Sequence, residues 1–316
     1  MRTRFSIFFL SVLVLAVVAS RRRHRRGTPE RVAGTFPNGM GYVRMGTGAK
    51  TLLWIPDPSH NGDLAASGGA PKSMYLATMV KVFRPFVEEG YSVFLVGHKP
   101  DLPHGCTVAD MAEDYAGLIV DEFAGKVDLL VADSNGGMIG FCLAARHSDL
   151  FGHIATIVAS YTMTEEAKAA NLESARLLSA ERKTDAAEAM VAFMYPKIRA
   201  RWVTRLFASV VARVSFPAAY NPTDVLVAAE ALGAFDGREI LPTIPVPVLL
   251  VCGDRDRFVP KAVYEQTAEL IPDCTVELYE GKDHLGAILD KRLPSDVLEF
   301  TRRIRTSASE RDASRA

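Results

Sequence analysis

Residues 127–137 read Val-Asp-Leu-Leu-Val-Ala-Asp-Ser-Asn-Gly-Gly, and this stretch decides the fold. An apolar strand, Val127–Ala132, is expected to run directly into a helix, with Ser134 at the turn between them. The five residues from Ala132 to Gly136 have the form small–x–Ser–x–Gly. Small residues flank the serine of such an elbow because a larger side chain would collide with neighbouring backbone. The pattern predicts Ser134 as a nucleophile, and the alternative is an ordinary turn whose serine caps the helix.

From about residue 40 the chain alternates short β-rich runs with helical stretches. The expected strands are Gly41–Met45, Thr51–Ile55, Ser92–Gly97, Val127–Ala132, Ile154–Ala159, Val246–Cys252 and Thr275–Tyr279. The expected helices lie near 72–89, 107–124, 136–147, 260–271 and 295–305. The middle strands are apolar on both faces, as strands buried in a parallel sheet are. The order predicts an α/β fold with a mostly parallel central sheet flanked by helices, opened by a hairpin that turns at Gly46-Thr47-Gly48.

The alternation is interrupted between residues 161 and 240, where the pattern is helical and mostly without strands. Apolar residues from Ile198 to Val214 recur at about one and two helical turns and include Trp202 and Phe207. Arginines occupy the other face of this helix (Arg199, Arg201, Arg205 and Arg213). The stripe is expected to pack on neighbouring helices. A compatible interpretation is a lid whose apolar face, with Trp202 and Phe207, lines a substrate pocket.

A serine hydroxyl is a weak nucleophile unless a base takes its proton and an acid orients that base. His284 is the only histidine after residue 153, and it follows an expected strand. The acid should lie just past the preceding strand, where Asp254 and Asp256 compete. The spacing Gly-x-x-Asp, followed by an apolar residue and proline, selects Asp256, whereas Asp254 is interpreted as a turn former.

The elbow, the segment Gly253-Asp254-Arg255-Asp256 with Val259-Pro260, and Gly281-Lys282-Asp283-His284 occur in order over residues 40–305. In these features the chain resembles the α/β-hydrolase superfamily of the type with one helical cap. The resemblance implies acyl transfer to water, in which Ser134 attacks a carbonyl, His284 shuttles the proton and Asp256 holds the imidazole. It implies no metal and no organic cofactor.

The loop after the strand Thr51–Ile55 departs from the pattern of that superfamily, in which it supplies the second donor of an oxyanion hole. The first donor is expected from the amide of Asn135. Pro58 falls at the second position and has no N–H. Asp57, expected beside the substrate, would repel a forming oxyanion. A shift of the loop would let Ser59, His60 or Asn61 donate instead.

The 316 residues carry equal numbers of acidic and basic side chains, but seven arginines and no acid fall within residues 1–26. The remainder has 30 basic against 37 acidic side chains, which gives no electrostatic footprint for nucleic acid. The apolar run 5–19 lies between arginines and resembles a signal or anchor segment. Dense arginine at 21–26 favours a membrane anchor with a cytosolic catalytic body, and secretion after cleavage is the alternative. Four widely spaced cysteines are expected to be reduced.

These features predict an N-terminal segment at 1–26, a core at 27–160 and 241–305, a helical cap at 161–240, and a disordered tail at 306–316. The predicted function is serine hydrolysis of a carboxylic ester or related acyl bond in a small, hydrophobic substrate. Alternatives with the same fold are hydrolysis of C–C, amide or peptide bonds, a perhydrolase, or an impaired enzyme that only binds. The oligomeric state is left open.

Overall fold

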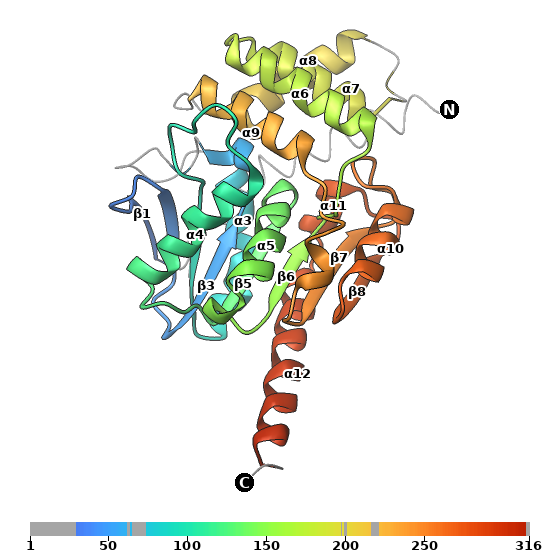
Figure 1. Ribbon diagram of the computed structural model, residues 1–316. Coiled ribbons are helices and arrows are strands. Elements are labelled where there is room, and N and C mark those ends of the chain that lie inside the picture. Colours follow the sequence, from blue (N-terminus) through green and yellow to red (C-terminus); the bar gives the residue numbers. More distant parts are fainter. Residues whose placement is uncertain are drawn as a thin grey trace. The chain divides into compact units, whose positions relative to one another are not determined.

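A computed structural model describes residues 30–61, 64, 74–196, 198, 201–215 and 221–313 (Figure 1). The strands are β1 (Arg31–Thr35), β2 (Gly41–Met45), β3 (Lys50–Ile55), β4 (Tyr91–Val96), β5 (Leu129–Asp133), β6 (Ile154–Ile157), β7 (Val248–Gly253) and β8 (Cys274–Tyr279). The α-helices are α3 (Met74–Glu88), α4 (Val108–Glu122), α5 (Asn135–Arg146), α6 (Glu165–Ser179), α7 (Lys183–Met194), α8 (Arg201–Ser215), α9 (Pro222–Ala234), α10 (Lys261–Leu270), α11 (His284–Ile288) and α12 (Leu293–Ala313). Short 3-10 helices are η1 (Pro58–His60), η2 (Ser148–Leu150) and η3 (Leu241–Thr243).

The strands form one sheet in the order β1-β2-β4-β3-β5-β6-β7-β8. From β4 to β8 every pair of neighbours is parallel, whereas β2 is antiparallel to both β1 and β4. All residues of β5 and β7 are buried, because helices cover both faces of the sheet. The predicted α/β architecture with a mostly parallel sheet is therefore confirmed.

The predicted opening hairpin at Gly46-Thr47-Gly48 is wrong. These residues connect β2 to β3, but β4 lies between the two strands and pairs with both. The glycines serve this crossing instead: Gly46 has a φ of +81°, and a Cβ on Gly48 would collide with the carbonyl of Gly90 at the start of β4. The hairpin that opens the sheet is the preceding one, formed by β1 and β2.

Two termini of the fold differ from the expectations. β1 was not predicted, because its sequence Arg-Val-Ala-Gly-Thr is only partly buried and lacks a regular apolar alternation. The last helix continues to Ala313, so the tail expected to be disordered from residue 306 is helical over 306–313. No glycine or proline falls in that stretch to end the helix.

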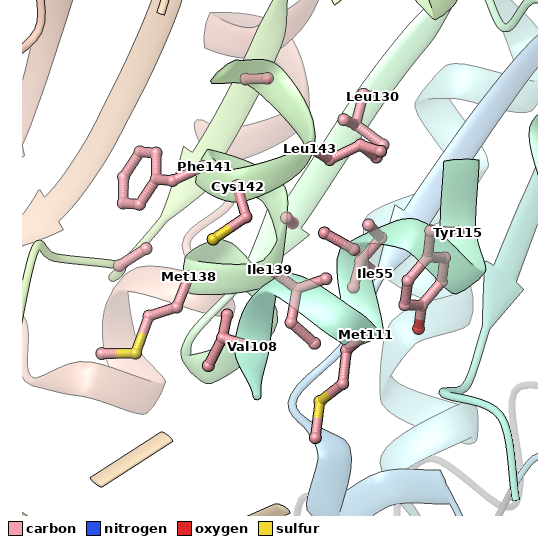
Figure 2. Packing of buried hydrophobic residues seen from close by; sticks show 14 of the residues in the cluster. Ile55, Val108, Met111, Tyr115, Leu130, Met138, Ile139, Phe141, Cys142 and Leu143 are labelled. Atoms are coloured by element: carbon pink, nitrogen blue, oxygen red, sulfur yellow. The ribbon is translucent and has the colours of Figure 1, made fainter. Parts of the chain in front are cut away.

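Helices α4 and α5 contribute to the hydrophobic core on one face of the sheet, and α3 and α12 contribute to the core on the other. Figure 2 shows the first core, where Met111 of α4 lies near Ile139 of α5. The Tyr115 hydroxyl donates to the carbonyl of Val96, which ties α4 to the end of β4 (O···O 2.9 Å). This packing fixes α5, and with it the turn at its N-terminus.

Helices α6, α7, α8 and α9 follow β6 before the chain returns to the sheet at β7, and the described residues between these two strands contain no strand. Figure 1 shows them beyond the carboxyl ends of the parallel strands. Asp224 of α9 is buried and accepts the amides of Asp101 (3.0 Å) and Leu102 (2.8 Å) from the loop after β4. That a cap over residues 161–240 acts as a separate domain stays a prediction.

The apolar run 5–19 and the arginine cluster 21–26 lie outside the described residues. Among the helices that the structure describes, none is both long and apolar enough to cross a bilayer. All four cysteines are free.

Candidate active site

Ser134 lies at the sharp turn between β5 and α5 and has a φ of +54° and a ψ of −129°. A positive φ is strained for a residue with a side chain. It is maintained here because the buried strand before Ser134 and the buried helix after it fix the direction of the backbone on both sides. Gly136 is required two residues after Ser134, since a Cβ there would lie 2.5 Å from the carbonyl oxygen of Ile55. A Cβ on Gly137 would likewise collide with the side chain of Ala159. The steric account of the small residues in this motif therefore fits the structure.

His284 reaches the serine from the loop after β8, as the first residue of the short helix α11. Its Nε2 lies 2.9 Å from Ser134 Oγ, and its Nδ1 lies 2.6 Å from Asp256 Oδ2. The structure thus brings together the three side chains selected from the sequence, in one line of hydrogen bonds. Asp283, the N-cap of α11, accepts the amide of Gly286 (2.8 Å) and fixes the start of this helix.

Asp256 is held in place by several donors besides the histidine. Its Oδ1 accepts the amides of Phe258 (2.8 Å) and Val259 (3.2 Å), and its Oδ2 accepts the hydroxyl of Tyr264 (2.6 Å). The side chain of Asp256 is completely buried, whereas Asp254 is exposed. Tyr264 was not identified from the sequence, because an aromatic residue on an amphipathic helix carries no signal for this contact.

Charge around the imidazole favours its protonated form. Burial lowers the pKa of His284, but the charge and hydrogen bond of Asp256 raise it, and Asp57 and Asp133 raise it further. The resulting pKa lies above the ordinary value for histidine. This environment suits a base that must hold a proton while a neighbouring bond is broken.

Asp133 precedes the nucleophile at the buried end of β5. Burial raises its pKa to about 6, although the indole N–H of Trp54 donates to its Oδ1 and lowers the pKa. Neither residue was identified from the sequence, since a buried Asp–Trp pair in neighbouring strands leaves no local pattern.

The loop after β3 places a carboxylate beside the serine. Asp57 Oδ2 lies 3.4 Å from Ser134 Oγ and accepts the side-chain amide of Asn135 (2.7 Å). Pro58 is buried at the start of η1 and offers no N–H.

The three residues that follow Pro58 use their amides within the turn. Ser59 donates to Asp57 Oδ1 (2.9 Å), His60 donates to the Asp57 carbonyl (3.0 Å), and Asn61 donates to the Pro58 carbonyl. The shift that would let one of them face an oxyanion is therefore absent from this structure. Asn135 is the first residue of α5, so its amide lies at the N-terminus of that helix, and its role as the first oxyanion donor stays a prediction.

Aromatic side chains extend from the histidine to the helices between β6 and β7. The Phe258 ring lies 4.8 Å from the His284 ring, and Phe193 of α7 lies 4.9 Å from Phe258. The guanidinium of Arg257 lies 5.1 Å from the centroid of the Phe193 ring. One side of the site is thus apolar, and it is built by residues that the sequence did not single out.

Trp202 and Phe207, both expected to line a substrate pocket, differ in their placement. Trp202 is 72% exposed, so the expectation is wrong for this residue. The buried side of α8 is formed instead by Thr204, Ala208 and Ala212, and a residue two positions away lies roughly on the opposite side of a helix. Phe207 is half-buried, and its ring centroid lies 6.5 Å from that of Tyr195.

Comparison with known proteins identifies the family. The profile of the alpha/beta hydrolase fold family matches residues 63–291. The chain belongs to the α/β-hydrolase fold family. The resemblance stated from the three sequence segments is confirmed at this level.

Two curated relatives of this α/β-hydrolase cover part of it. A putative carbamate hydrolase, RutD, of Yersinia enterocolitica is 29% identical over 177 residues, which are 54% of this chain and 61% of the relative. The 2-(acetamidomethylene)succinate hydrolase of Mesorhizobium japonicum is 28% identical over 193 residues, which are 57% and 65% of the two chains. The chain thus spans less than two thirds of either relative.

The fold also agrees with solved structures. A thermophilic esterase from Thermogutta terrifontis superposes with a TM-score of 0.62 at 19% identity, over 88% of this chain and 99% of that chain. At this identity the agreement concerns the fold alone.

Proposed function

We propose that this α/β-hydrolase is a serine hydrolase that cleaves a carboxylic ester or related acyl bond through an acyl-enzyme on Ser134. The observation that carries the proposal is the hydrogen-bond line from Ser134 Oγ through the His284 ring to the buried Asp256 carboxylate. The apolar side of the site at Phe258 and Phe193 favours a small, hydrophobic substrate.

In the proposed reaction, Ser134 Oγ attacks the carbonyl carbon while its proton passes to His284 Nε2. The Asp256 carboxylate stabilises the imidazolium, and the amide of Asn135 donates to the oxyanion. His284 then gives its proton to the leaving group. A water molecule releases the acyl group by the same steps in reverse, with His284 again as the base.

A panel of p-nitrophenyl esters of increasing acyl length tests this proposal. The wild-type chain is expected to release p-nitrophenol with a preference for one range of chain lengths. Ser134→Ala should lose nearly all of this activity, because removal of a triad member costs about 10⁴-fold or more in kcat. Ester turnover by Ser134→Ala at the wild-type rate would contradict the proposal.

A second candidate is an acyl compound whose carbonyl carbon bears nitrogen. It is favoured by Asp57, a hydrogen-bond acceptor 3.4 Å from Ser134 Oγ, which would repel an oxyanion but would accept an N–H beside the reacting carbon. The names of the two relatives, a carbamate hydrolase and a 2-(acetamidomethylene)succinate hydrolase, support the same class.

Phenyl N-methylcarbamate and phenyl propionate form a matched pair for this candidate, because an N–H replaces a CH₂ beside the carbonyl. Asp57→Ala should lower kcat/KM for the carbamate relative to the propionate by about tenfold or more, since a hydrogen bond to a charged group contributes about 1.5–3 kcal/mol. The intrinsic reactivities of the substrates cancel in the ratio. An equal change for both substrates would exclude a role of Asp57 in recognising nitrogen.

The proposal includes attachment to a membrane through residues 5–19, with the catalytic body on the cytosolic side. It is supported by the arginines on both sides of this apolar run. Protease protection of intact membrane vesicles distinguishes this orientation from secretion after cleavage.

A further inference from the structure

Helix α8 carries a row of apolar side chains on its outer surface. Trp202, Leu206 and Val210 are 72%, 57% and 43% exposed, and their spacing of four residues places them on one side of the helix. No other helix in the described part of the chain exposes three large hydrophobic side chains. Such a contiguous apolar face indicates an interaction surface for another molecule or a membrane.

The exposed row is not needed for the packing of α8 against the rest of the protein. Thr204, Ala208 and Ala212 form the buried side of α8, and Ala208 and Ala212 share a small apolar cluster with Ala187 of α7. Arg205 further ties the two helices, because its guanidinium lies 2.9 Å from Glu188 and 3.4 Å from Asp185. The contact between α8 and α7 therefore does not depend on the outer row, which stays largely exposed.

The charge of this segment indicates what the partner is. Besides Arg205, which pairs with carboxylates of α7, residues 197–215 contain four basic residues and no acidic one: Lys197, Arg199, Arg201 and Arg213. A basic helix with tryptophan and leucine on one face is typical of segments that lie in the plane of a membrane interface. Anionic lipid headgroups complement both its charge and its apolar row.

We propose that the outer face of α8, formed by Trp202, Leu206 and Val210, inserts into the interface of a membrane that contains anionic lipid. This contact is distinct from the apolar run at residues 5–19. The same helix is linked to the site, because its Phe207 ring packs near Tyr195. Tyr195 in turn lies beside Asp283, the residue directly before His284. Burial, and after it the Asp283 carboxylate, raise the pKa of Tyr195 to about 12. Docking through α8 thus brings the His284 side of the site close to the lipid surface.

Tryptophan fluorescence of the full chain tests the proposal. The chain has two tryptophans, and Trp54 is completely buried, so a change in emission on lipid addition reports Trp202. Vesicles of phosphatidylcholine mixed with phosphatidylglycerol should shift the emission to shorter wavelength, and vesicles of phosphatidylcholine alone should shift it far less. Leu206→Glu and Val210→Glu should each abolish the shift while leaving turnover of a water-soluble ester unchanged. The matched control is Val120→Glu on α4, where the side chain is 54% exposed; this variant should keep the shift.

Three results would overturn the proposal. The first is sedimentation of the chain with anionic vesicles without a change in Trp202 emission, which would mean that residues 5–19 alone make the contact. The second is Trp202 emission that already lies at short wavelength without lipid, which would mean that another segment of the chain covers the row. The third is a shift that appears without lipid as the protein concentration rises, which would mean that the row joins two copies of the chain.

Discussion

At the scale of single residues, Asp133 shows how the elbow changes the chemistry of a side chain. It is buried beside the nucleophile, and its pKa of about 6 lies above the ordinary 3.8. Between about pH 4 and pH 6, Asp133 therefore keeps its proton in the folded state, whereas in the unfolded chain it has lost it. This proton stabilises the fold below about pH 4, and the contribution is lost as the pH rises through about 6.

Asp133→Asn is expected to remove this pH dependence, because asparagine is neutral and still accepts the indole N–H of Trp54. The difference in the free energy of unfolding, variant minus wild type, should increase between about pH 4 and pH 7 by on the order of 3 kcal/mol at most. Denaturant titrations at several pH values measure the difference. The exposed Asp149→Asn serves as the control, and parallel curves for Asp133→Asn and wild type would contradict the interpretation.

The sequence allowed Ser134, His284 and Asp256 to be selected because each follows an expected strand at a local motif, and the strands before Ser134 and Asp256 are strongly apolar. It did not reveal Tyr264 or Phe193, which reach the site from helices and carry no motif. Nor could it say that Asp57 turns towards Asn135, because that contact joins residues 78 positions apart and depends on the turn at Pro58. Contacts over such separations are decided by packing and leave no pattern in the chain.

At the scale of elements, the buried carboxylate of Asp224 ties α9 to the loop after β4. Asp224 satisfies two amides of that loop, including that of Asp101, whose φ of 59° is unusual for a residue with a side chain. The carboxylate thus fixes both a helix beyond the sheet and a strained loop at its edge.

Asp224→Ala should destabilise the protein by about 3 kcal/mol, because two amides lose a charged acceptor that is buried. The amides of Asp101 and Leu102 should also exchange their hydrogens faster, since the loop opens locally more often. Glu230→Ala, at an exposed position of the same helix, is the control and should change neither quantity. Unchanged exchange in Asp224→Ala would mean that other contacts hold α9.

Element boundaries were predictable where apolar runs and capping residues agree, as for α4, which begins after a Thr107–Asp110 capping box. The apolar periodicity of α8 was also predictable, but not which side of it is buried. Small residues, Ala208 and Ala212, face α7 and allow the helices to approach closely, so the large apolar residues remain outside. A hydrophobic pattern alone cannot distinguish these two arrangements.

At the scale of the whole molecule, the sheet order brings the ends of β5, β7 and β8 to the same edge, as expected for parallel strands. Ser134, Asp256 and His284 follow these three strands, so the topology assembles the site from segments up to 150 residues apart. The antiparallel start of the sheet was predicted with the wrong pairing, because the Gly46–Gly48 turn resembles a hairpin locally while β4 inserts between its strands.

The most direct test of the account is the reaction of the full chain with a fluorophosphonate, located by mass spectrometry of its peptides. The phosphonyl adduct should be found on Ser134. Labelling should fall sharply in His284→Ala, because no base then takes the proton of the serine hydroxyl. Ser134→Ala should show no adduct at this site. Well-folded wild-type protein that remains unlabelled, or an adduct on another residue, would contradict the assignment of Ser134 as the nucleophile.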